Sequence, residues 1–133
     1  MHATTLYQIN TRALLTELSR TLAKPATLDD IPDQLLDSWK EYGFEWIWML
    51  GVWQTGVAAQ TVSRTHSGWR HDYQASLNDL REEDIDGSCF AIIDYRTHTR
   101  LGGDDALLRL RRRLYDRGMR LMLDFVPNHM ALD

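Results

Sequence analysis

The chain has 133 residues, 44% of them hydrophobic and 26% charged, and its 15 basic and 19 acidic side chains give a net charge of −4. This composition is typical of one globular domain and excludes a disordered or collagen-like chain. The acidic balance argues against nucleic acid as a partner, because neutralising phosphates requires a basic surface.

The same sequence carries no sign of a membrane span or of export. Its apolar stretches fall far short of the roughly 20 residues that a membrane helix needs, and its first residues lack the pattern of a signal peptide. The single cysteine, Cys89, cannot form an intrachain disulfide. We therefore expect a cytoplasmic protein that makes no membrane contact.

Arginine accounts for 13 of the 15 basic residues, and six of these arginines lie between residues 109 and 120. A cluster of this kind suits the binding of phosphate groups. The negative net charge instead favours the solvated face of a helix.

The first elements are predicted from short periodic segments. Residues 5–10 are rich in β-forming side chains and predict a strand. Leucines then recur at helical spacing over 14–22, with Thr11 as the expected N-cap. A second amphipathic helix is expected between Pro32, which suits a first turn, and Gly43, which suits the position just beyond a helix end.

The remaining elements complete an alternating order. Residues 44–53 are apolar at nearly every position and predict a strand buried on both faces. Residues 54–87 predict a long loop with one short helix at about 74–80. A helix over 105–117 and an apolar strand over 119–126 follow. This order of strands and helices predicts an α/β fold with parallel strands.

Polar side chains follow the last predicted strand at Asp124, Asn128 and His129. In parallel α/β folds, ligands bind outside the carboxyl ends of the strands. A carboxylate, an amide and an imidazole there could bind several hydroxyl groups or a cation. The residue types equally suit a capped turn with a surface histidine, so they leave both interpretations open.

The longer pattern carries a resemblance. Residues 118–129 resemble the first conserved region of glycoside hydrolase family 13, the α-amylase family, whose pattern is Asp-x-Val-x-Asn-His. Residues 6–12 and 45–53 resemble the first two barrel strands of that family. Residues 87–95, followed by 101–103, resemble the segment that precedes its third strand. The four segments occur in the family's order, and the resemblance that they mark extends over nearly the whole chain.

The resemblance implies a partial TIM (β/α)8 barrel, consisting of the first three βα units with a long loop between strands 2 and 3. Residues 1–133 would form one amino-terminal fragment of a catalytic barrel domain. His129 would bond a hydroxyl of the sugar, and Asp124 would help to organise the same pocket. Phe90 would stack on the sugar ring in place of the family's usual tyrosine, and Asn128 would be a candidate calcium ligand; no other cofactor is implied.

A barrel of this kind needs about 250 residues, and the resemblance places its nucleophile and acid/base carboxylates beyond Asp133. The chain is therefore predicted to be an inactive fragment of an enzyme that hydrolyses or transfers α-glucans or oligosaccharides. A stand-alone, non-catalytic carbohydrate-binding or interaction module is the alternative. Uncovered sheet edges favour self-association. Trp69, in the predicted loop, is either a further sugar contact or an exposed loop residue.

Overall fold

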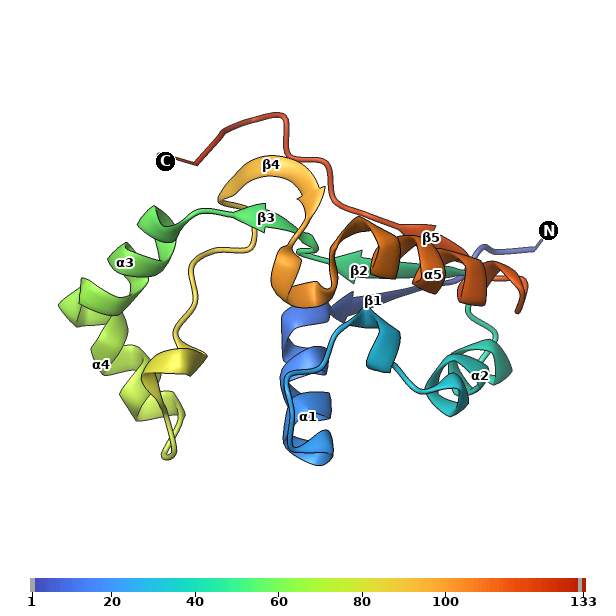
Figure 1. Ribbon diagram of the computed structural model, residues 1–133, viewed down its shortest axis with the longest axis horizontal. Coiled ribbons are helices and arrows are strands. Elements are labelled where there is room, and N and C mark those ends of the chain that lie inside the picture. Colours follow the sequence, from blue (N-terminus) through green and yellow to red (C-terminus); the bar gives the residue numbers. More distant parts are fainter. Residues whose placement is uncertain (1, 132) are drawn as a thin grey trace. The chain divides into compact units, whose positions relative to one another are not determined.

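The computed structural model describes residues 2–131 and 133, which form two compact units (Figure 1). The sheet unit comprises the described residues up to Val52 together with Arg96–Phe125. The helical unit comprises Trp53–Tyr95 together with the described residues from Val126 onward. The sequence predicts no boundary inside the chain, because the passages between the units do not run through linkers rich in glycine, proline or serine.

The sheet unit is built on three parallel strands in the order β1-β2-β5. These strands are β1 (Leu6–Asn10), β2 (Trp46–Leu50) and β5 (Arg120–Met122), which lie side by side in Figure 1. Both pairings are parallel, so the expected α/β architecture is confirmed. The last strand is shorter than the expected 119–126, because the chain leaves the sheet after Met122.

The central strand β2 is buried on one face. Ile47 and Met49 are completely buried, whereas the three residues that alternate with them are half-buried. The expectation of one strand over 44–53, buried on both faces, is therefore wrong. Gly51 adopts a φ of +76°, which turns the chain and separates β2 from the next strand, β3 (Trp53–Thr55).

Helices form the connections between these parallel strands, as such crossovers require. The helices α1 (Thr11–Leu22) and α2 (Asp33–Glu41) lie between β1 and β2, with a 3-10 turn, η1 (Leu28–Asp30), between them. A second 3-10 turn, η3 (Thr99–Leu101), and the helix α5 (Gly103–Tyr115) precede β5. The completely or almost completely buried core lies among these elements and includes Leu28, Ile31, Leu36, Ile47, Leu110, Leu114 and Met119.

Asn10, and not Thr11, caps α1. The Asn10 side chain accepts a hydrogen bond from the Ala13 amide at 3.1 Å, while Thr11 is completely buried. Both residue types cap helices well, so the local sequence could not distinguish them. Burial of Thr11 against the rest of the unit decides the outcome.

Half of the arginine cluster forms a ladder of ion pairs with the first crossover. Arg109 binds Asp29 through two hydrogen bonds of 2.8 Å, and Arg113 binds Asp33 at 2.9 Å. One turn further, Arg117 binds Asp37 at 2.6 Å, and it also reaches Asp33. Spacing by four residues on both segments aligns these pairs along one side of α5. These three arginines therefore join two crossovers, whereas Arg111, Arg112 and Arg120 are exposed, as expected of a solvated face.

The helical unit contains β3, α3 (Val57–Thr65), α4 (Ser67–Ser76), a 3-10 turn η2 (Glu82–Asp84) and most of β4 (Ile92–Thr97). The strands β3 and β4 pair as a two-stranded sheet. The predicted long loop with one helix at 74–80 is wrong, since two helices occupy 57–76. Three of the unit's described residues are buried, namely Ser63, Ile85 and Ile92, so little apolar periodicity marks its helices.

No helix among residues 2–131 is both long enough and apolar enough to cross a membrane.

We expect acid to weaken the sheet unit by removing the ladder. The hydrogen bond from Arg109 lowers the pKa of Asp29, and that from Arg113 lowers the pKa of Asp33. Such a group contributes stability above its unfolded pKa, near about 4, and loses the contribution as the pH falls through its lower folded pKa. The urea midpoint should therefore fall below about pH 5, and it should fall less steeply in Asp29→Asn.

Glu41→Gln is the matched control, because the Glu41 carboxyl forms no ion pair with any residue that the structure describes. Equilibrium unfolding of the wild type and both variants at several pH values makes the comparison. If the urea midpoint of Asp29→Asn fell with pH as steeply as that of the wild type, the ladder would not be a source of the acid sensitivity.

Candidate functional site

Asp124 lies just beyond the end of β5 and binds two groups of the neighbouring strand segment. Its Oδ1 accepts a hydrogen bond from Trp48 Nε1 at 2.6 Å, and its Oδ2 accepts one from the Gly51 amide at 2.6 Å. The side chain is buried, with 8% of the residue exposed. Both carboxyl oxygens are therefore engaged by protein donors, and the end of β5 is tied to the end of β2.

The sheet register explains why these groups meet. Trp48 lies opposite Met122 in the parallel pairing of β2 with β5. Asp124 follows Met122 by two residues, just beyond the end of β5, and this position brings its carboxyl group within reach of the Trp48 indole. The Gly51 amide, just beyond the end of β2, donates to the same carboxyl group.

The segment beyond Asp124 belongs to the helical unit from Val126 onward. The Val126 amide donates to Tyr95 Oη at 2.8 Å, and the Ala131 amide donates to the Ile92 carbonyl at 3.3 Å. Asp133 Oδ2 accepts from the Ala58 amide at 2.9 Å, near the start of α3. These bonds attach the segment to α3 and β4 and thereby position His129.

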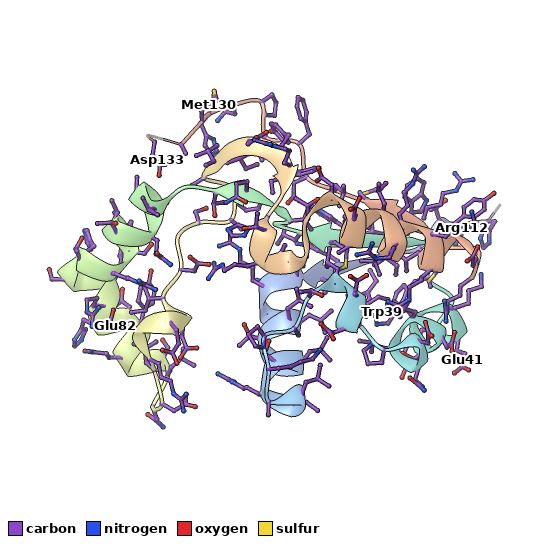
Figure 2. The ribbon with its side chains drawn as sticks, viewed as in Figure 1. Trp39, Glu41, Glu82, Arg112, Met130 and Asp133 are labelled. Atoms are coloured by element: carbon purple, nitrogen blue, oxygen red, sulfur yellow. The ribbon has the colours of Figure 1, made fainter. Side chains whose placement is uncertain are left out.

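His129 lines a cavity of about 270 Å³ within the helical unit. Its imidazole is exposed and forms no hydrogen bond with the residues that the structure describes. Trp69 on α4 and Ser63 on α3 line the same cavity. Met130, labelled in Figure 2, also contributes to the wall and is 78% exposed.

Phe90 and Asn128 occupy turns of the helical unit. Phe90 is half-buried, and its amide donates to Ser88 Oγ at 3.2 Å. Asn128 is exposed. Over residues 2–131 and 133, no group of three His, Cys, Asp or Glu side chains is arranged to hold a metal ion. One amide oxygen falls far short of the six to eight oxygen ligands that calcium takes, so Asn128 as a calcium ligand stays a prediction.

The sequence-predicted residues thus divide between the two units. Asp124 belongs to the sheet unit, whereas Phe90, Asn128 and His129 belong to the helical unit. Sequence reasoning missed the partners of Asp124, namely the Trp48 indole and the Gly51 amide. The signal for them is the parallel register that sets Trp48 opposite Met122, two residues before Asp124, and only the pairing of the strands reveals it.

The structure is similar to parts of several solved structures. The structure aligns 99% of the chain with 13% of a hypothetical maltooligosyl trehalose synthase from Sulfolobus tokodaii, at 19% identity and a TM-score of 0.57. It aligns 96% of the chain with 12% of maltooligosyltrehalose synthase from Arthrobacter ramosus, at 17% identity and a TM-score of 0.57. Trehalose-6-phosphate hydrolase from Bacillus licheniformis is similar over 96% of this chain and 17% of its own, at 18% identity and a TM-score of 0.56.

No family model matches the sequence, and no curated protein matches it. At such low identities, the structural similarity shows the fold alone. The chain spans 12% to 17% of the length of the three solved structures. The resemblance expected from the sequence is therefore confirmed as an α/β fold shared with part of much longer proteins.

The bond between Trp48 and Asp124 generates a stability prediction. Trp48→Phe keeps an aromatic ring but removes the indole donor and leaves Oδ1 of a buried carboxyl group without that partner. A hydrogen bond to a charged group contributes about 1.5–3 kcal/mol, and we expect a loss of this size in the free energy of unfolding, measured by urea denaturation.

Trp46→Phe is the matched control on the same strand, because the Trp46 indole forms no hydrogen bond with the described residues and the ring lies 5.4 Å from the Arg120 guanidinium carbon. Phenylalanine retains a ring in that place. Equal losses in the two variants would show that the Trp48–Asp124 bond adds nothing beyond the size of the side chain.

Proposed function

We propose that the chain is the amino-terminal part of a catalytic (β/α)8 barrel of the α-amylase family, glycoside hydrolase family 13. The full enzyme would hydrolyse or transfer α-linked glucans or oligosaccharides with retention of configuration. The observation that carries this proposal is the Asp124–His129 motif beginning at the carboxyl end of a parallel sheet, in a chain whose fold is shared with part of maltooligosyltrehalose synthase.

The proposed roles follow the resemblance. His129 would bond a sugar hydroxyl, which suits an exposed imidazole that has no hydrogen-bond partner among the described residues. Phe90 would offer an aromatic surface to the C–H face of the ring. Asp124 would act as a positioning residue, because its two oxygens hold Trp48 and Gly51.

Retaining hydrolysis requires a nucleophile and an acid/base carboxylate about 5–5.5 Å apart. The family places both on later strands, so neither is assigned to a residue of this chain. In this proposal the 133 residues bind part of the substrate and perform no bond cleavage by themselves. We place such an enzyme in the cytoplasm, with no nucleic-acid or membrane partner.

The alternative function is a stand-alone, non-catalytic module that binds carbohydrate or another protein. The two functions predict different DNA sequences downstream of codon 133. A continuing reading frame that encodes further strands ending in carboxylates supports the enzyme. A stop codon with unrelated sequence after it supports the module.

Saccharide binding tests the proposed function directly. Isothermal titration of the folded chain with maltotriose should give saturable binding, whereas cellotriose, its β-linked counterpart, should bind at least about tenfold more weakly. His129→Ala should weaken maltotriose binding and leave the melting temperature unchanged, because the imidazole is exposed and forms no hydrogen bond with the described residues.

The same preparation should hydrolyse no activated α-glucoside. Cleavage by the purified 133-residue chain would contradict the assignment of its catalytic carboxylates to later strands. Failure of the folded chain to bind maltotriose would contradict the proposed function itself.

We also propose that copies of the 133-residue chain by itself associate through the outer side of β5 and α5, which the next strand of the proposed barrel would otherwise cover. Beside β5, a groove of about 560 Å³ is lined by Leu108, Tyr115 and Leu121 together with Arg111 and Arg120. Leu108 is 58% exposed and Tyr115 is 71% exposed. Exposed apolar surface next to an open strand edge favours association.

Sedimentation velocity over a range of protein concentrations should therefore detect self-association, and added salt should strengthen it by screening the arginines of facing copies. Leu108→Gln should weaken the association. Tyr42→Gln should not, since Tyr42 is equally accessible, at 77% exposed, but lies outside the groove. A monomer at all protein concentrations would contradict the proposed self-association.

A further inference from the structure

The cavity of the helical unit has the size and lining of a small-molecule site. Its volume is about 270 Å³, just below the range of about 300–1,000 Å³ that is usual for drug-sized ligands. It therefore suits one ring and not an extended chain. Helices α3 and α4, the segment 88–91 and the segment 129–131 form its walls.

Charge is absent from the described residues that line this cavity. The wall consists of alanines, Val62, Met130 and Trp69, with polar groups supplied by Ser63, Ser88 and His129. A phosphate or carboxylate placed there would meet no lysine or arginine among these lining residues. A charged ligand loses its hydration on entering an apolar wall and needs a partner of opposite charge to compensate, so the lining favours a neutral ligand.

Ser63 supplies an unused polar group. It is 7% exposed, and its hydroxyl forms no hydrogen bond with the residues that the structure describes. His129, on the lining segment 129–131, also lacks a hydrogen-bond partner among the described residues. Two groups in one cavity are thus available to a ligand with hydroxyls.

Trp69 supplies a rigid aromatic surface. Its ring stacks on His66 with a centroid distance of 4.4 Å, and its amide donates to His66 Nδ1 at 3.3 Å, which caps α4. These contacts hold the indole while 43% of the residue remains exposed. An aromatic face beside hydroxyl and imidazole groups suits a ligand with one C–H face and a polar rim.

We propose that this cavity binds a single neutral pyranose ring, with Trp69 as its stacking surface and with Ser63 and His129 bonding its hydroxyls. The proposal rests on the proposed function, since it names the position at which one sugar unit of the substrate is held. It adds Trp69 and Ser63 as binding residues, and it specifies an unmodified sugar in preference to a phosphorylated one.

Isothermal titration of the full 133-residue chain tests the proposal with three probes, namely maltotriose, glucose and glucose 6-phosphate. Glucose should bind at least about tenfold more tightly than glucose 6-phosphate. Trp69→Ala should weaken maltotriose binding by roughly tenfold or more, and Trp69→Phe should retain most of the affinity. Ser63→Ala should weaken it by a smaller factor.

His71→Ala is the matched control, because His71 is an exposed residue on the same helix outside the cavity lining. Thermal melts establish that each variant is folded. Unchanged maltotriose affinity in Trp69→Ala, together with a loss in His129→Ala, would overturn this inference and leave the proposed function intact. Equal binding of glucose and its 6-phosphate would overturn the preference for a neutral sugar. No maltotriose binding by the folded wild type would overturn both proposals.

Discussion

Parallel pairing on both sides of β2 is the constraint that determines the architecture of the sheet unit. A parallel neighbour cannot be reached by a tight turn, so the chain must cross over the sheet between successive strands. The two crossovers place α2 and α5 where the Asp29–Asp37 and Arg109–Arg117 series meet. The same pairing brings the carboxyl ends of β2 and β5 to one edge, where Asp124 can bind Trp48 and Gly51.

The elements of this unit could be predicted because burial leaves a periodic pattern in the sequence. Helix α5 repeats leucine at positions 107, 110 and 114, and these side chains are buried or nearly so. The ends of elements could not be predicted equally well, because they depend on contacts with distant residues. Asn10 caps α1 while Thr11 is completely buried, and β2 ends where Gly51 donates its amide to Asp124.

The helices of the helical unit could not be predicted, because few of its residues are buried. Polar contacts hold its helices, and such contacts leave no periodic pattern in the sequence. The His66 side chain caps α4, Arg64 donates to the Ile85 carbonyl at 3.0 Å, and Arg70 pairs with Glu82. Each of these bonds is specific in space but ordinary in sequence, since arginines, glutamates and histidines are typical of exposed loops as well.

The Asp124–His129 motif joins both kinds of segment, and its two ends have different physical roles. Asp124 is buried and uses both oxygens to bind its own strand neighbours, so a ligand would have to displace a protein donor to reach either one. His129 is exposed, is held by the bonds of residues 126–133 to the helical unit, and has no hydrogen-bond partner among the described residues. Under the proposed function, the first residue of the motif therefore contributes stability and the last contacts the ligand. In that proposal, a substitution at Asp124 would act on binding through the fold, whereas one at His129 would act on binding alone.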